Sequence, residues 1–410
     1  MHRIRVCADK PLNSSSSCSR SDRRIALFEL GFRPFFLFAA LYSIWATLAW
    51  FAVYVVGVQL ASTDMAAPAW HAHEMIYGYG TAVVAGFLLT AAQNWTGLRT
   101  LNSTPLGLLL VLWLIPRAAP YVWPAAPAGL LAIFDLAFLA MLICAVGWVV
   151  LESGNRKQFV ILLLLALLLL GNGAYYLDLA GFVPGIAQKA VLSGLYALLA
   201  LVLILAGRVV PFFTERGVGY PVQLMNLSWV DPANLVLFAA FWISELIDLG
   251  NTPQALLSAA LFLLNAYRLW GWYTHGIWKK PLVWVLHVAY GFLTAGFLLT
   301  LLSSLAGISP YLAIHAFAYG GIGMMTLGMM SRVTLGHTGR SVQQPPSTLT
   351  FAFGSLVAGT LIRVIAPIAA PSQYVLWVGL SQALWVAAFA VFLIVLGSAL
   401  VQPRVDGKPG

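Results

Sequence analysis

The most constraining feature of this sequence is a succession of apolar runs, each about 20 residues long, which is the length of helix that spans a bilayer's hydrocarbon core. The runs are continuous and do not alternate with period two, so they favour helices over a membrane β-barrel. Breaks rich in Pro, Gly, Asn and charge separate twelve of them: 33–57, 73–95, 105–123, 126–150, 158–180, 187–213, 231–249, 253–274, 281–303, 309–331, 348–369 and 373–400. The expected fold is an all-α, polytopic integral membrane protein with about twelve transmembrane helices.

Composition supports lipid as the main solvent of this chain. Of 410 residues, 61% are apolar and only 9% are charged, whereas soluble domains carry about 25% charge. So few charges cannot cover a water-facing surface, but a lipid-facing surface must avoid them, because each costs about 3 kcal/mol at a helix centre. Membrane lipid is therefore an expected partner.

The lysines and arginines predict the orientation, because they accumulate on the cytoplasmic side of membrane proteins. With the N-terminus inside, only Arg117 and Lys189 fall outside, while Arg208, Arg268 and Arg363 lie in or near spans. Both termini are therefore expected to be cytoplasmic, and the net charge of +9 indicates topology and requires no nucleic-acid partner. The 17 residues then placed inside are Arg3, Arg5, Lys10, Arg20, Arg23, Arg24, Arg33, Arg99, Arg156, Lys157, Arg216, Lys279, Lys280, Arg332, Arg340, Arg404 and Lys408.

The domain organisation is simple. Residues 1–24 are basic and Ser-rich and lack the apolar run of a secretory signal, so they predict a disordered cytoplasmic tail. A transmembrane domain over 25–402 and a cytoplasmic tail over 403–410 follow. Within that domain, Pro116, Arg117 and Pro120 predict a third span that is kinked, shortened or partly re-entrant.

Histidines are the candidate functional groups, because polar side chains inside a bilayer are costly and imidazole is the commonest metal ligand. The densest cluster holds His71, His73 and Glu74 at the outer end of the second span. Residues two apart on a helix point about 200° away from each other, so His71 and His73 share a metal only if this segment is irregular. Glu74 is three residues from His71 and would ligate or orient its imidazole. An interfacial cap at a helix start explains the cluster without a metal.

By depth the remaining histidines separate into two groups. His315 lies about 9 Å into the tenth span from the outer side, near the level of His71 and His73. His287 lies as far in from the cytoplasmic side, and His337, 22 residues after His315, is about 33 Å from it along a helix. Two metal or haem centres, one near the outer side and one near the inner side, are therefore favoured over a single centre. The alternative for each histidine is an ordinary interhelical hydrogen bond. His275 beside Lys279 predicts only an interfacial role.

Arginines near the spans suit carboxylates, because the guanidinium fork binds two oxygens at once. Arg208, Arg332 and Arg33 are candidates to hold haem propionates, and anchoring to the cytoplasmic surface explains each of them equally well. The chain has no Cys-x-x-Cys-His motif, so any haem would be bound non-covalently, as haem b. The sequence also lacks nucleotide-binding loops, His-Glu-x-x-His and serine elbows, which disfavours ATP-driven transport, zinc proteolysis and soluble-type hydrolysis.

Short motifs follow one another from about residue 25 onward. They are Leu30-Gly31-Phe32-Arg33-Pro34-Phe35-Phe36, Trp70-His71-Ala72-His73-Glu74-Met75, Gly86-Phe87-Leu88-Leu89-Thr90, Asn94-Trp95-Thr96-Gly97, Arg208-Val209-Val210-Pro211-Phe212-Phe213-Thr214, Trp284-Val285-Leu286-His287, His315, and Arg332 with Thr334-Leu335-Gly336-His337-Thr338-Gly339-Arg340. In this order the motifs resemble one known family, the NnrS proteins.

The resemblance implies a twelve-helix protein of the bacterial inner membrane that binds haem and copper and belongs to the nitric oxide response, often alongside denitrification. The family motifs contain His71, His73, His287, His315 and His337 but not His275. The leading hypothesis is a protein that binds or reduces nitric oxide, or protects against its derivatives; as an enzyme it would be a haem/copper oxidoreductase. The alternatives are a transporter of a metal, haem or metal-nitrosyl species, and a sensor or assembly factor.

Overall fold

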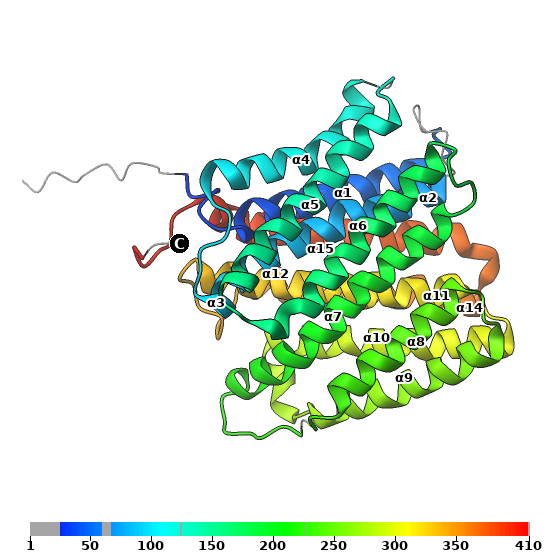
Figure 1. The fold of residues 1–410 in the computed structure, drawn as a ribbon. Helices are drawn as coiled ribbons and strands as arrows, with labels where there is room; N and C mark the ends of the chain where they lie inside the picture. Colours follow the sequence, from blue (N-terminus) through cyan, green and yellow to red (C-terminus); the bar gives the residue numbers. More distant parts are fainter. Residues whose placement is uncertain (1–24, 60–66, 124, 226, 409–410) are drawn as a thin grey trace, which may run out of the picture.

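The computed structural model describes residues 25–408, except 60–66, 124 and 226. In this part of the chain the regular elements are helices, and they form twelve successive segments (Figure 1). In chain order the segments are α1 (Phe32–Phe51) with η1 (Ala52–Val56); α2 (Ala67–His73) with η2 (Glu74–Gly80) and α3 (Thr81–Thr96); α4 (Ser103–Val122); α5 (Ala128–Glu152); η3 (Arg156–Gln158) with α6 (Phe159–Leu179); α7 (Ala187–Gly217); α8 (Val230–Leu246); α9 (Asn251–Gly271); α10 (Pro281–Ala306), preceded by η4 (His275–Lys279); α11 (Pro310–His315) with η5 (Ala316–Gly323) and α12 (Met324–His337); α13 (Thr348–Val364) with α14 (Ala366–Ala369); and η6 (Pro371–Gln373) with α15 (Tyr374–Val401).

These segments confirm the predicted positions of the twelve apolar runs, and the protein is a polytopic membrane protein. Ten segments of the described chain are long and apolar enough to cross a bilayer. The other two are α8, which has only 17 residues, and α9, whose buried face carries Gln254, Asn265 and Arg268. The predicted count of about twelve spans is therefore refined to twelve helices with ten clear spans.

The outward-facing side chains fit a lipid environment. Large apolar residues point away from the protein on several spans, among them Trp148 (66% exposed), Leu170 (67%) and Ile394 (81%). Buried positions, in contrast, hold charged groups such as Arg33, Arg117 and Asp135. This distribution suits a protein whose surroundings are hydrocarbon and whose polar groups must find partners inside.

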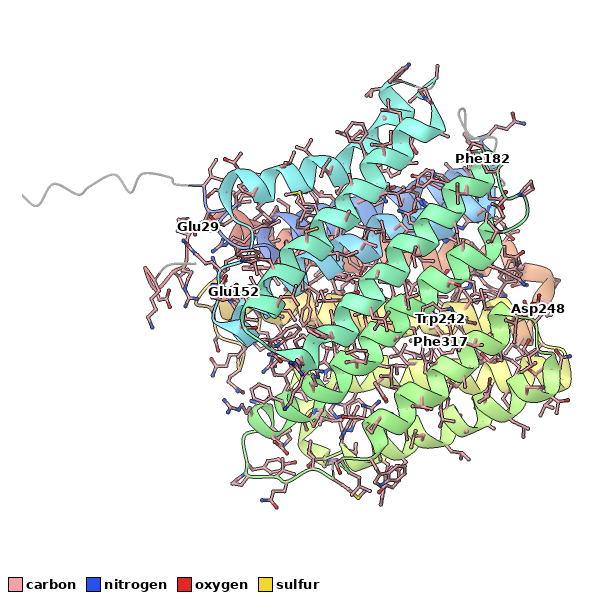
Figure 2. The ribbon with its side chains drawn as sticks, viewed as in Figure 1. Glu29, Glu152, Phe182, Trp242, Asp248 and Phe317 are labelled. Atoms are coloured by element: carbon pink, nitrogen blue, oxygen red, sulfur yellow. The ribbon has the colours of Figure 1, made fainter. Side chains whose placement is uncertain are left out.

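The helices run between two faces of the molecule. Figure 2 shows Glu29 and Glu152 at one end of the helices and Phe182 and Asp248 at the opposite end. The two described ends of the chain meet at the first of these, where the Ala26 backbone nitrogen donates to the Val401 carbonyl over 2.8 Å. We call this end the inner face and the opposite end the outer face. That the inner face is cytoplasmic stays a prediction, and the predicted tail over 1–24 lies outside the described residues.

The third span, α4, is an unbroken helix of 20 residues, although it contains Pro116 and Pro120. It is neither re-entrant nor interrupted. Arg117, placed between the two prolines, is buried rather than exposed to lipid.

The second and tenth spans are the most deeply buried in the described chain, and both widen into a π-helical stretch. The stretch η2 begins directly after His73, and η5 begins directly after His315. Such wider turns occur frequently at functional sites. They change the facing of the residues before and after them, so each histidine stands where its helix changes register.

Glycines let η5 approach α10 closely, and Gly321 is the tightest of them. A Cβ built there would lie 1.9 Å from Cδ2 and 2.6 Å from Cγ of the fully buried Leu293. We expect Gly321→Ala to destabilise the protein by about 1–3 kcal/mol through overpacking. Gly354→Ala is the matched control, because nothing lies within 4 Å of its built Cβ. Thermal unfolding in one detergent measures both, and equal midpoints would contradict the expected packing defect.

Candidate functional site

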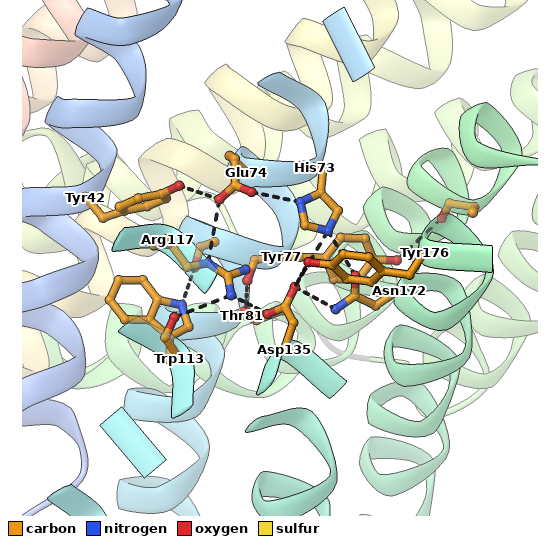
Figure 3. A network of polar contacts seen from close by, with 12 residues as sticks. Tyr42, His73, Glu74, Tyr77, Thr81, Trp113, Arg117, Asp135, Asn172 and Tyr176 are labelled. Atoms are coloured by element: carbon orange, nitrogen blue, oxygen red, sulfur yellow. Dashed lines mark hydrogen bonds and ion pairs between the residues drawn. The ribbon is translucent and has the colours of Figure 1, made fainter. Parts of the chain in front are cut away.

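A cluster of charged and polar side chains lies buried between the first five spans, toward their outer ends (Figure 3). The members with ionisable side chains come from α2, η2, α4 and α5. Each lies about five to seven residues inside the outer end of its helix, so all of them meet at one depth of roughly 8–10 Å. We call this cluster the outer charged network; it comprises Tyr42, His73, Glu74, Arg117, Asp135, Asn172 and Tyr176.

Arg117 links the two carboxylates of the network. Its guanidinium donates a hydrogen bond to Asp135, and its Nε lies 3.6 Å from Glu74 Oε2. Tyr42 donates its hydroxyl to the same Glu74 oxygen, while Tyr176 donates to Asp135 Oδ2 over 3.2 Å. Both carboxylates are thereby compensated inside the protein, as buried charges must be.

His73 lies between the two ends of the network, with both ring nitrogens engaged. Nδ1 is 3.0 Å from Glu74 Oε1 and Nε2 is 2.9 Å from Asn172 Oδ1. Asn172 uses its Nδ2 to donate to Asp135 Oδ2 over 3.1 Å, which directs its oxygen toward His73. Both nitrogens therefore face acceptors, an arrangement suited to a ring carrying two protons, so that two cations balance two carboxylates. In this arrangement neither His73 nitrogen is free for a metal.

A second polar cluster lies at the outer ends of the first, second, tenth, eleventh and twelfth segments, and its members contact one another in succession from His71 to His315. His71 stacks on Trp50 with centroids 4.7 Å apart, Trp50 packs on Tyr54 at 5.2 Å, and Tyr54 on Tyr374 at 6.4 Å. Arg363 then donates to the Tyr374 hydroxyl over 2.9 Å and to His315 Nε2 over 3.0 Å. His315 and His71 lie within electrostatic reach of each other and close the ring. We call these six residues the outer histidine ring.

The two histidines of this ring differ in what occupies their nitrogens. His315 Nδ1 lies 2.7 Å from the Tyr311 carbonyl and donates to it, which leaves Nε2 to accept from Arg363. His71 Nδ1 is buried and has no hydrogen-bond partner among the described residues. An imidazole nitrogen without a partner in a buried place calls for a ligand, a metal or a water.

The predicted pairing within the second span is changed by this geometry. His71 faces Trp50 of α1 whereas His73 faces Asn172 of α6, which confirms that the two rings point apart. Glu74 was expected to orient His71, but it holds His73 instead. Glu74 is the first residue of the π-helical stretch, and its Oε1 lies 3.0 Å from Nδ1 of the adjacent His73.

The inner half contains a cluster around His337 and Arg33. The His337 ring packs on Phe32 with centroids 5.6 Å apart, and Arg33 and Arg404 lie within electrostatic reach of it. Arg33 is fully buried, and its Nη1 donates to the carbonyls of Ala399, Leu400 and Gln402 at the end of α15. Its Nε and Nη2, together with Nη1 of Arg340, are buried without hydrogen-bond partners among the described residues.

Arg404 is already neutralised in this inner cluster. It donates from Nε and Nη2 to the Asp406 carboxylate over 2.9 and 2.7 Å. These hydrogen bonds hold the pKa of Asp406 well below its usual range. Arg33 and Arg340 are therefore the guanidinium groups with nitrogens still to satisfy.

The remaining predicted residues lie apart from both centres. His287 has Nδ1 3.1 Å from the Val283 carbonyl and Nε2 3.2 Å from the Trp272 carbonyl, so both nitrogens face backbone acceptors. Arg208 donates to Gln158 Oε1 over 2.9 Å, and Arg332 lies over the Phe213 ring at 3.8 Å. The structure thus joins His71 with His315 and Arg33 with His337, but does not bring Arg208, Arg332 or His287 to either pair.

Comparison with known protein families gives one match, to the family described as NnrS protein, over residues 26–404. The chain belongs to the NnrS family. This confirms the resemblance of the short motifs and places the protein among membrane proteins associated with the nitric oxide response. A search of curated proteins finds no match.

In the described part of this NnrS-family protein, no group of three or more His, Cys, Asp or Glu side chains is arranged to hold a metal ion. The outer histidine ring offers two imidazoles, and the inner cluster offers one. Any metal there would need further ligands of another kind, such as a macrocycle, water or a bound small molecule.

Most of the outer charged network of this NnrS-family protein was not predicted from the sequence. Arg117 was placed among the outer topological charges and Asp135 was not considered. The signal was present, because an ionisable residue within an apolar span is a functional candidate by default. Both lie inside such runs, and their equal depth below the outer ends of successive antiparallel helices predicts that they can meet.

Proposed function

We propose that this NnrS-family protein binds haem and copper in the bacterial inner membrane and uses them to bind nitric oxide during the cellular response to it. The observation that carries the proposal is the buried, unpartnered His71 Nδ1 beside His315. Family membership supports it, since the residues of the outer ring and of the inner cluster lie within the matched range of 26–404.

The outer histidine ring fits copper better than it fits a hard cation. Imidazole nitrogens suit copper, whereas Mg²⁺ and Ca²⁺ require oxygen ligands, and the ring contains no carboxylate. His71 Nδ1 is ready to ligate in its present position. His315 contributes Nε2 only when Arg363 releases it, because that nitrogen now accepts from the guanidinium.

The inner cluster fits a haem with two carboxylates. His337 supplies an imidazole for which no hydrogen-bond partner is found among the described residues, next to the flat ring of Phe32. Arg33 and Arg340 hold the buried N–H groups without partners, and such groups suit carboxylate oxygens. Of the arginines predicted to hold propionates, Arg33 is therefore retained. Arg208 and Arg332 are assigned to packing at the inner surface.

Bound at these places, a haem iron or a copper ion would supply an open coordination position for nitric oxide. The protein's own residues hold the imidazoles in place: Tyr311 fixes the tautomer of His315, and Trp50 fixes the plane of His71. The outer charged network supports the same helix from its other side through His73.

Haem and copper analysis of the purified protein tests this proposal. We expect haem absorbance and copper in the wild type, loss of haem in His337→Ala, and loss of copper in His71→Ala. His275→Ala is the control, because His275 is exposed in the inner loop between α9 and α10 and contacts neither cluster. A well-folded wild type that contains neither haem nor copper, after expression with both supplied, would overturn it.

A further inference from the structure

Arg363 of the outer histidine ring is a buried cation whose hydrogen-bond partners among the described residues are both neutral groups. Its residue is 8% exposed, and its partners are the Tyr374 hydroxyl and His315 Nε2. The Tyr374 ring lies under its guanidinium at 5.2 Å. Within 4.0 Å of the Arg363 guanidinium, the described residues contribute no carboxylate.

Of the other three buried arginines in the described spans, two pair with a carboxylate. Arg117 pairs with Asp135, and Arg268 Nη2 lies 2.7 Å from Asp231 Oδ1. Arg33 faces three carbonyls at the end of α15, where the helix dipole carries partial negative charge. Because a buried charge without a counter-charge is costly, and because no carboxylate of the described residues pairs with Arg363, an anion bound at this position would be stabilising.

We propose that Arg363 and His71 bind a small, planar, singly charged oxyanion, and that nitrite is the member of this class suited to a protein of the nitric oxide response. The choice of nitrite rests on the proposed function; the anion site itself rests on the uncompensated charge. The guanidinium fork matches two oxygens held in one plane. The unpartnered His71 Nδ1 provides one more donor when that nitrogen carries the proton.

The surroundings set the size of the ligand and its route of access. Trp50, Tyr54 and Tyr374 pack along the aromatic side of the ring, and this crowding disfavours a bulky ligand such as a phosphate ester. Tyr54 is 38% exposed at the outer face, so an anion reaches Arg363 from that side. An anion bound to Arg363 also competes with His315 for the guanidinium, and therefore frees His315 Nε2.

Thermal unfolding of the metal-free, full-length protein, with and without nitrite, tests this site. We expect nitrite to raise the wild-type midpoint in a saturable way, and nitrate or bicarbonate to act more weakly, with chloride and sulfate as ionic-strength controls. Arg363→Gln is expected to keep or raise the midpoint without anion, because it removes an uncompensated charge, and to weaken nitrite binding at least ten-fold. A purely structural arginine would instead lower the midpoint when replaced.

Two further variants sharpen the result. Arg216→Gln is the matched control, because Arg216 is an exposed arginine stacked on Phe212 at the inner end of α7. His71→Phe keeps a ring to stack on Trp50 but removes Nδ1, and we expect several-fold weaker nitrite binding. Equal nitrite stabilisation of the wild type and Arg363→Gln, or none in the wild type, would overturn the anion site. Because no metal is present, that failure is distinct from a failure to bind haem or copper.

Discussion

Replacing Arg117 with glutamine is expected to destabilise the protein by about 3–5 kcal/mol, the cost typical of removing one partner from a buried ion pair. Arg117 is buried and compensates both Asp135 and Glu74, so its loss leaves two carboxylates with His73 as the single cation. Thermal unfolding in one detergent measures the change. Arg216→Gln provides the control for loss of an exposed arginine and is expected to have little effect.

A second substitution distinguishes loss of charge balance from loss of shape. Asp135→Asn in the Arg117→Gln background restores equal numbers of cations and anions, since His73 then faces Glu74 alone. We expect the double variant to lose less unfolding free energy than the two single variants lose together. The expected difference is about 0.5–3 kcal/mol, the usual range for coupled neighbours. Strictly additive losses would show that Arg117 and Asp135 do not act as a pair.

Removing both imidazoles of the outer histidine ring, in His71→Ala with His315→Ala, is expected to reduce bound copper from near stoichiometric to background. The physical reason is that these are the imidazoles of the described chain that the structure joins at the outer face. Copper content per protein after extensive dialysis measures it, with haem content from the same samples as the internal reference. Haem is expected to remain, because His337 and Arg33 lie in the inner half of the molecule.

His73→Gln separates the two outer clusters in the same assay. Both His73 nitrogens already face protein acceptors, so we expect this variant to lose stability but to keep its copper. If copper is lost with His73 and retained without His71 and His315, the metal ligand belongs to the outer charged network, and the assignment of the outer ring is wrong.

The positions of the helices could be predicted because a bilayer imposes length and polarity on every span. Runs such as 126–150 and 373–400 were found as α5 (Ala128–Glu152) and α15 (Tyr374–Val401). The prediction of membrane spans was least accurate at α8, which is short, and at α9, which is more polar, because length and apolar composition do not mark these helices as clear spans. The opposite facing of His71 and His73 was predictable from helical geometry alone.

Partnerships between helices could not be predicted, because they depend on which spans are neighbours. Nothing local to Arg363 indicates that it donates to His315, 48 residues earlier, or that Tyr374 lies beneath it. In the sequence, Arg33, Arg208 and Arg332 share the same position near the inner end of a span. In the structure, Arg33 is buried against backbone carbonyls, Arg208 donates to a glutamine and Arg332 lies over a phenylalanine ring. Neither the π-helical turn that begins at Glu74 nor the contact of Glu74 with His73 leaves a clear signature in the residue pattern.

The most direct test of the central claim is an anaerobic titration of the reduced, purified protein with nitric oxide, followed by absorbance and electron paramagnetic resonance. We expect a saturable spectral change in the wild type and in His275→Ala, and its loss when His71, His315 and His337 are replaced together. A wild type that contains haem and copper but shows no nitric oxide-dependent change, or a triple variant that responds as the wild type does, would contradict binding at these histidine-held centres.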